Sequence, residues 1–129
     1  MKVFFNTCHE AIDYTINNKL FGLYYSESFT QNLFIHMHDC CELFLALSDG
    51  NYFLINDNVY TVKKNDLFII NQFESHKVNA VNKDKFLRYS FHVHPEFLIN
   101  NSSSKDNFLK IFSTYNNNNK MLDCVCCGE

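Results

Sequence analysis

The sequence predicts a mainly β domain, built as an antiparallel sandwich or barrel, and three observations support this prediction. Short runs of β-branched and aromatic residues recur between residues 21 and 93, and Ser, Asp, Asn and Gly separate them at regular spacing. The chain is 47% hydrophobic and 16% aromatic, with one proline and three glycines, which is typical of a packed domain. Its 129 residues are enough for one sizeable core, so we expect a single domain.

The first expected element is a short helix over residues 8–18, because Thr7 and Glu10 fit the capping-box pattern. Apolar runs bounded by turn residues then predict a series of strands. The run over residues 43–47 is apolar throughout, which indicates a strand that is covered on both faces. The strands are expected at residues 21–25, 33–38, 43–47, 52–55, 59–62, 67–70, 77–81 and 86–93.

Downstream of the last predicted strand, the apolar period changes from that of a strand to that of a helix. Ser103 or Ser104 can cap an amphipathic helix over residues 104–115, whose apolar stripe must pack on the sheet or on another subunit. The Asn-rich run that follows is typical of a linker. We therefore expect residues 1–115 to form the domain and residues 116–129 to form a linker-like tail.

Composition and charge exclude several classes of protein. A formal charge of −3 leaves no excess of lysine and arginine to neutralise phosphates, so the chain is not expected to bind DNA by itself. The N-terminal apolar run is too short for a signal peptide, and no apolar run approaches the roughly 20 residues of a membrane span. The six cysteines are therefore expected to be free thiols, and the protein is expected to be cytoplasmic.

The candidate site is the stretch from His36 to Glu42, together with His76. Side chains alternate along a strand, so His36 and His38 share a face, and Glu42 keeps that parity if the strand has no bulge. His76 can reach the same interior from a neighbouring strand of a meander. Two hypotheses follow. The four residues hold iron, manganese, nickel or zinc, or they form a polar pocket for an organic effector and require no cofactor.

Two pairs of residues close to this motif have both a structural and a functional interpretation. Cys40 and Cys41 suggest redox chemistry, but adjacent cysteines rarely form a useful disulfide and a free cysteine commonly behaves as a small buried hydrophobe. His92 and His94 alternate with apolar residues and share a strand face. They are either additional ligands or hydrogen-bonded residues of that face.

The order of these motifs resembles that of a cupin, a double-stranded β-helix or small jelly-roll barrel. More narrowly, it resembles the N-terminal effector-binding cupin domain of AraC-type transcription regulators. The resemblance covers residues 21–115 and implies a barrel with a short N-terminal helix and a C-terminal amphipathic helix. The residues that carry it are His36, His38, Glu42, Gly50, the run Asn65-Asp66-Leu67, the loop Asn71 to His76 and the segment Arg88 to Leu98.

The chain departs from the family pattern at two positions. Asn65 replaces a glycine, which is a mild change because Asn tolerates left-handed backbone. Gln72 replaces a proline in the loop that ends at His76, and this removes a rigid φ from that loop.

The resemblance implies a sensor that binds a small-molecule effector in the barrel, for which a sugar is one candidate. It also implies a homodimer that binds DNA only through a C-terminal helix-turn-helix domain absent from this chain, without catalytic residues and without membrane contact. The alternative is a stand-alone metal-dependent cupin enzyme, an isomerase or an oxygenase. The aromatic residues are mainly core, although some can face the barrel mouth, and the expected effector-binding residues are His36, His38, Glu42, His76, Tyr24 and Tyr52.

Overall fold

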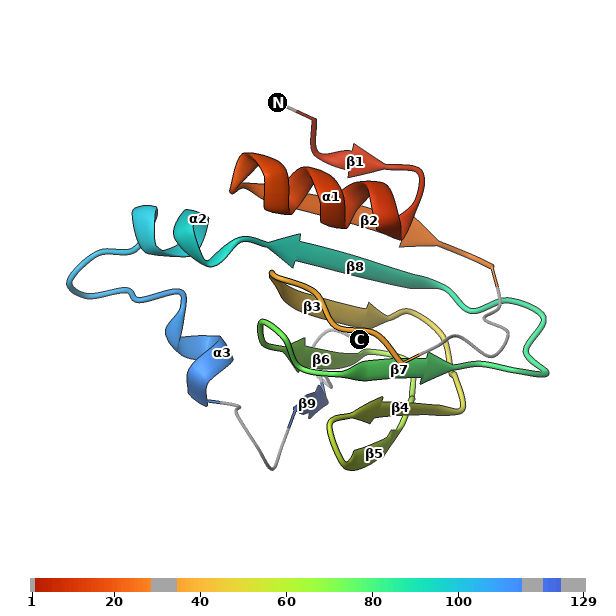
Figure 1. The fold of residues 1–129 in the computed structure, drawn as a ribbon. Coiled ribbons are helices and arrows are strands. Elements are labelled where there is room, and N and C mark those ends of the chain that lie inside the picture. Colours follow the sequence, from red (N-terminus) through yellow and green to blue (C-terminus); the bar gives the residue numbers. More distant parts are fainter. Residues whose placement is uncertain (1, 29–34, 115–119, 124–129) are drawn as a thin grey trace.

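The protein is described by a computed structural model that covers residues 2–28, 35–114 and 120–123. Most of the predicted strands are confirmed, as is the N-terminal helix (Figure 1). The helices are α1 (Cys8–Asn18), α2 (Pro95–Asn100) and α3 (Lys110–Thr114). The strands are β1 (Phe4–Phe5), β2 (Phe21–Ser26), β3 (Cys41–Ala46), β4 (Tyr52–Ile55), β5 (Asn58–Thr61), β6 (Asp66–Ile70), β7 (His76–Asn79), β8 (Arg88–Val93) and β9 (Met121–Asp123).

The strands form two sheets. One is six-stranded, in the order β1-β2-β8-β3-β6-β9, and the other is three-stranded, in the order β5-β4-β7. Every pairing is antiparallel except that of β1 with β2. Strands that are distant in the sequence, such as β3 and β8, lie side by side in the larger sheet. The predicted mainly β fold class, a small jelly roll of the cupin type, is confirmed.

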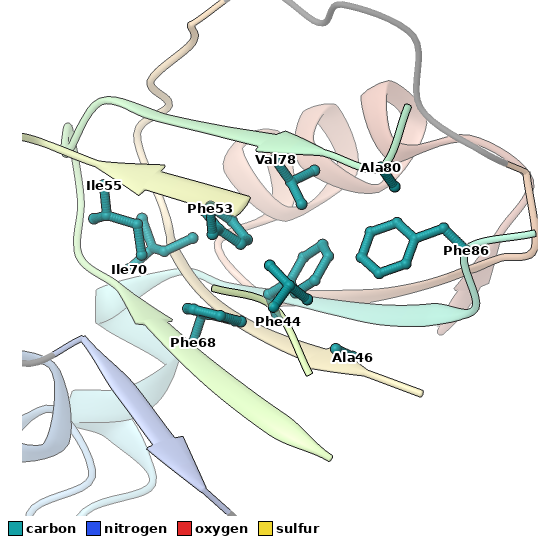
Figure 2. Packing of buried hydrophobic residues seen from close by; sticks show 10 residues of the cluster. Phe44, Ala46, Phe53, Ile55, Phe68, Ile70, Val78, Ala80 and Phe86 are labelled. Carbon is teal, nitrogen blue, oxygen red and sulfur yellow. The ribbon is translucent and has the colours of Figure 1, made fainter. Parts of the chain in front are cut away.

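A hydrophobic core lies between the two sheets (Figure 2). Inward-facing residues alternate along each strand, as Phe44 and Ala46 do on β3. Phe44 of the larger sheet meets Phe53 of the smaller one edge to face, with ring centroids 4.9 Å apart. The buried members of this core are Phe44, Ala46, Phe53, Ile55, Val62, Phe68, Ile70, Val78, Ala80 and Phe86.

Helix α1 packs against β2 through a position where a side chain would not fit. A Cβ on Gly22 would lie 3.1 Å from the Ala11 carbonyl oxygen and 3.1 Å from Thr15 Oγ1. The predicted cap is confirmed, because the amide of Glu10 donates to Thr7 Oγ1 at 3.2 Å. This close approach holds α1 against the inner face of the larger sheet.

The C-terminal helix is shorter than predicted, because polar side chains close separate turns where a helix over residues 104–115 was expected. Ser103 Oγ accepts from the amide of Asp106 at 3.0 Å, and Asn107 Oδ1 accepts from the amide of Leu109 at 3.1 Å. The helix begins only at Lys110. An additional helix, α2, follows β8 directly.

The outer face of the larger sheet is covered by a second apolar cluster. Phe112 of α3 is 2% exposed and packs with Cys41, Ile69 and Val93, so it belongs to the core rather than to a free surface. Of the predicted apolar stripe, Phe108 is 51% exposed. The apolar stripe predicted for one helix is therefore divided between the fold and the surface.

The predicted linker-like tail contains part of the fold. Strand β9 pairs with β6, with Met121 opposite Phe68, and forms an edge of the larger sheet. Lys120 just before it is fully buried, and its Nζ lies 2.7 Å from Glu74 Oε1. The boundary expected at residue 115 therefore falls inside the folded unit. Residues 116–119 and 124–129 of the predicted tail lie outside the described residues.

Candidate functional site

Strand pairing places an acidic and an imidazole side chain next to each other on the inner face of the larger sheet. Glu42 on β3 is paired with His92 on β8, and His92 is paired on its other side with Gly22 on β2. Because Gly22 has no side chain, Cys8 of α1 can approach, and its Sγ lies 3.9 Å from His92 Nε2. The site is therefore built where α1 crosses the sheet.

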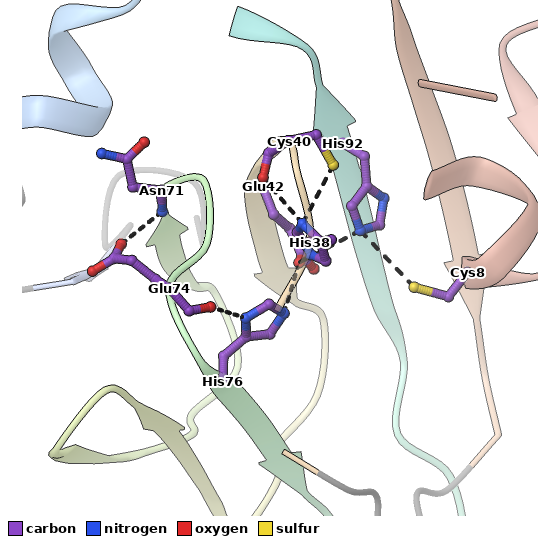
Figure 3. Close-up of polar contacts among 8 residues, drawn as sticks. All are labelled: Cys8, His38, Cys40, Glu42, Asn71, Glu74, His76 and His92. Carbon is purple, nitrogen blue, oxygen red and sulfur yellow. Dashed lines mark hydrogen bonds and ion pairs between the residues drawn. The ribbon is translucent and has the colours of Figure 1, made fainter. Parts of the chain in front are cut away.

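Three imidazoles surround one carboxylate oxygen of Glu42 (Figure 3). The distances from Glu42 Oε2 are 3.0 Å to His38 Nε2, 3.2 Å to His76 Nε2 and 3.4 Å to His92 Nε2. All four side chains are buried, and Glu42 is 4% exposed. His38 lies just before β3 and His76 begins β7, so the cluster joins the two sheets.

The predicted residues His38, Glu42 and His76 are thus brought together. His36 forms an isolated backbone bridge with His76, and the centroids of their two rings are 4.1 Å apart. His36 is exposed and forms a second group of potential metal ligands with His38 and His76. The predicted strand that contains His36 begins at residues 33–34, which lie outside the described residues.

Of the histidine pair His92 and His94, the structure places one in the cluster and one outside it. His92 is fully buried beside Glu42. His94 instead caps α2, where its Nδ1 accepts from the amide of Glu96 at 3.1 Å. The sequence signal that could have placed His92 in the site is the alternation of Arg88, Ser90 and His92 along β8. Because side chains alternate along a strand, these three residues point to the same, inner face.

The two predicted tyrosines lie in different places. Tyr24 lines a cavity beside the cluster, together with Glu42 and His76. Tyr52 neighbours Phe53 on β4, and Phe53 is the residue of this pair that is buried and lines the cavity. Because side chains alternate along the strand, Tyr52 faces the opposite side of the smaller sheet.

The cavity beside the cluster has a volume of about 210 Å³ and lies between the two sheets. The apolar part of its lining is Phe44 from the larger sheet and Phe53 and Val78 from the smaller one. The other lining residues are Cys8, Tyr24, His36, Glu42, His76, Arg88 and Ser90. A cavity with apolar walls and a few convergent polar groups is the usual form of a small-molecule site.

The ring nitrogens that face away from Glu42 define the protonation of two imidazoles. Nδ1 of His38 lies 3.0 Å from the Cys40 carbonyl oxygen, and Nδ1 of His76 lies 2.9 Å from the Glu74 carbonyl oxygen. A carbonyl only accepts, so both Nδ1 atoms must donate. In a neutral ring with a protonated Nδ1, Nε2 carries a lone pair. That lone pair would face the Glu42 carboxylate, so each contact needs either a proton or a cation between the nitrogen and the oxygen.

The electrostatics of the cluster follow from burial and from mutual attraction. Burial alone would raise the pKa of Glu42, but the charge of His92 and the contacts from all three imidazoles hold it well below the usual range. Burial alone would lower the pKa of His76, but the Glu42 carboxylate beside it raises the pKa above the usual value. In the metal-free protein, the carboxylate and this imidazole therefore stabilise each other's charged form.

These residues fit a divalent metal. Three Nε2 atoms and one carboxylate oxygen are the ligand types of such sites, and carbonyl partners on Nδ1 are the usual second contact of a metal-bound histidine. The ligand atoms of His38, Glu42 and His92 lie within 4.8 Å of one another. His92 Nδ1 is buried and has no hydrogen-bond partner among the described residues, so its ring has no such second contact.

The thiols near the site are not activated. The described cysteines Cys8, Cys40 and Cys41 are free, as expected. Burial raises the pKa of Cys8 to about 12 and that of Cys41 to about 11, and burial also raises the pKa of Cys40. A thiol acts as a nucleophile only as the thiolate, so none of the three is prepared for that chemistry at neutral pH.

The loop that presents His76 is fixed without the proline of the family pattern. The amide of Asn71 donates to Glu74 Oε1 at 2.7 Å, and the amide of Phe73 donates to the His38 carbonyl at 3.0 Å. Gln72, at the proline position, donates from its side chain to Asp39 Oδ1. Side-chain hydrogen bonds therefore replace the rigid ring. Asn65 has a φ of 74°, which confirms the left-handed backbone expected there.

Comparison with known proteins supports the fold. No family model and no curated protein matches the chain significantly. Among solved structures, a conserved protein of unknown function from Streptococcus pyogenes (SPY1581) has a TM-score of 0.51 at 19% identity, over 59% of this chain and 66% of that one. A cupin protein from Bacteroides fragilis (BF4112) has a TM-score of 0.47 at 15% identity, over 57% and 64%. The plu4264 protein from Photorhabdus luminescens has a TM-score of 0.43 at 24% identity, over 70% and 62%.

The likeness to the S. pyogenes protein concerns the fold alone, and the alignment spans less than two thirds of that protein. Within the described part of the chain, none of the helices has the length and apolar character needed to cross a membrane.

Proposed function

We propose that this chain is a small-molecule-binding cupin domain that serves as the ligand-sensing part of an AraC-type transcription regulator. The observation that carries the proposal is the cavity of about 210 Å³ between the two sheets, with Glu42 and His76 in its wall. The order of motifs along the sequence supports the link to that class of regulator. In this proposal the chain binds its effector in the cytoplasm and catalyses no reaction.

The position of the cavity gives the sensor a physical mechanism. Phe44 and Ser90 reach it from the larger sheet, and Phe53 and Val78 reach it from the smaller one. An effector that contacts both sheets favours the relative position of the two sheets that gives it the most contacts. It changes the regulator only to the extent that it binds one arrangement better than another. DNA binding would be carried by a helix-turn-helix domain outside this chain, and dimerisation would couple two such domains.

Ligand-induced stabilisation tests this proposal directly. A molecule that binds only the folded state raises the free energy of unfolding by about 2.7 kcal/mol at a hundred times its Kd. We expect one class within a panel of sugars, organic acids and amides to raise the melting temperature. The effect should be lost in Val78→Trp, which fills the cavity. A matched change on the outer face, Tyr52→Trp, should leave it intact. If no compound stabilises the wild type, the proposal is wrong.

A second function is favoured by one specific observation, the convergence of three Nε2 atoms on Glu42 Oε2. It is that of a metal-dependent cupin enzyme, an isomerase or an oxygenase. His38, His76, His92 and Glu42 would hold iron, manganese, nickel or zinc, and such an ion supplies Lewis-acid polarisation of an oxygen atom when it is bound. His36 is near enough to His76 to join the set. The cavity residues would then orient the substrate and exclude water from it.

Metal content separates the two functions. We expect the enzyme, if this is one, to purify with one divalent ion per chain, to lose it in His38→Ala and to turn over a small molecule. His94→Ala is the matched control, because His94 caps α2 away from Glu42. Protein that carries no metal after growth in supplemented medium, and binds none in titrations with zinc or nickel, would refute the metal-dependent function.

A further inference from the structure

A buried arginine lines the cavity and has no counter-charge among the described residues. Arg88 on β8 is the sole arginine of the sequence, and it is 7% exposed. Its Nη1 donates to the carbonyl oxygens of Ser28 at 2.6 Å and Phe86 at 2.8 Å. Within the described part of the chain, the rest of the guanidinium has no hydrogen-bond partner and no carboxylate lies within ion-pair distance. A buried charge without a partner is costly, so a ligand that supplies one would be favoured.

Two hydroxyl groups beside Arg88 have no hydrogen-bond partner among the described residues. Tyr24 and Ser90 are paired residues on β2 and β8, and both line the cavity. Ser90 is 3% exposed, and neither hydroxyl makes a hydrogen bond to another described residue. Buried polar groups are normally hydrogen-bonded. The remaining N–H groups of the guanidinium and the two hydroxyls therefore lie on one wall as donors that no described residue uses.

The rest of the cavity indicates the body of the ligand. Phe44, Phe53 and Val78 offer apolar surface and no donors from their side chains. An apolar cavity of about 150 Å³ holds a benzene molecule. The present cavity, of about 210 Å³, has room for a body of that size and one small polar group.

The opposite end of the cavity limits the ligand's charge. Arg88 and His92 are four residues apart on β8, which corresponds to roughly 13 Å along the strand. The Glu42 carboxylate lies at the His92 end, so in the metal-free protein it disfavours a second negative group there. A neutral sugar would leave the Arg88 charge unpaired and would place hydroxyls against aromatic rings.

We propose that the cavity binds a small monocarboxylic acid, with its carboxylate on Arg88, Tyr24 and Ser90 and its apolar body between Phe44, Phe53 and Val78. This rests on the proposed function, that the cavity is a small-molecule site, and adds the chemical class of the ligand. The planar fork of a guanidinium matches a carboxylate geometrically, which a lysine in the same position would not.

The test is isothermal titration of the full chain in EDTA, so that no metal can take the carboxylate. The probes are benzoate, phenylacetate and cyclohexanecarboxylate, each with its primary amide as the neutral counterpart of the same shape. We expect at least one acid to bind at least tenfold more tightly than its amide. Arg88→Met should remove that preference and leave amide binding unchanged. The control is Lys77→Met, which removes the cation that precedes Val78 on β7. It should leave the binding of both acids and amides unchanged.

Arg88 also holds two backbone carbonyls, so Arg88→Met could fail to fold, which circular dichroism would show. Tyr24→Phe and Ser90→Ala keep the shape of the wall, and each should then weaken the bound acid several-fold. Amides that bind as tightly as the acids, or acid binding that is unchanged in these variants, would overturn the proposed ligand class and leave the cavity as a small-molecule site. If a sugar binds while neither acids nor amides do, the proposed ligand class is wrong and the proposed sensor function stands. If nothing binds, both fail.

Discussion

Replacing Glu42 by Gln should destabilise the metal-free protein strongly, and more at pH 6 than at pH 8.5. The change removes the negative charge on which His38, His76 and His92 converge and leaves the buried imidazoles in place. Removing one partner of a buried ion pair costs roughly 3–5 kcal/mol, because the other charge is left unpaired. A typical domain has only about 5–15 kcal/mol of stability in total, so the variant should be close to unfolding at pH 6.

The pH dependence follows from the raised pKa of His76. A group whose pKa is higher in the folded state contributes its stability fully below the unfolded value near 6.5 and loses it as the pH rises through the folded value. At pH 8.5 the wild-type advantage from this pair is therefore smaller than at pH 6, and the Gln variant loses less relative to the wild type. The pKa of Glu42 is lowered, so its own contribution is present above about 4.5 and is complete at both pH values.

Urea unfolding in EDTA at the two pH values measures the difference. Glu27→Gln is the control, because Glu27 makes an exposed ion pair with Lys85 at 3.6 Å, and such pairs contribute about 0–1 kcal/mol. We expect a loss of several kcal/mol at pH 6 for the Glu42 variant and less than about 1 kcal/mol for the control. A Glu42 variant that loses less than 1 kcal/mol, or the same amount at both pH values, would show that the His76 imidazole is not charged beside this carboxylate.

Three further predictions concern the metal, the C-terminal helix and the last strand. Metal ligation needs neutral imidazoles, so the thermal stabilisation by zinc should be larger at pH 8 than at pH 6 and should be absent from His38→Ala; equal stabilisation at both pH values would exclude imidazole ligands. Phe108 is exposed, so Phe108→Asp should weaken a dimer in sedimentation experiments without lowering the melting temperature. Phe112 is buried, so Phe112→Asp should unfold the protein. A monomeric wild type would refute the prediction for Phe108. Glu74→Gln should lower the free energy of unfolding by about 3–5 kcal/mol, because it leaves the Lys120 ammonium buried and unpaired. A loss below 1 kcal/mol in urea unfolding would show that this pair does not hold β9.

Much of the fold could be predicted from local patterns alone. The capping pair Thr7 and Glu10 located α1, and alternating or continuous apolar runs located most of the strands, because both signals depend only on neighbours in the sequence. The C-terminal region was predicted less well for the same reason. Ser103 and Asn107 bind nearby amides and interrupt a helical pattern, and Phe112 is buried by a sheet that the pattern cannot show.

The sequence by itself determined the mainly β class and the residue types of the site, because apolar periodicity and the local motif are enough for these. Only the tertiary structure decided that His92 stands beside Glu42, that Lys120 closes the fold on Glu74, and that Arg88 lines a cavity with no carboxylate of the described residues within ion-pair distance. Each of these contacts joins strands or loops far apart in the sequence. Their register comes from the pairing of whole strands, such as β3 with β8, and local sequence patterns carry no information on which strands become neighbours.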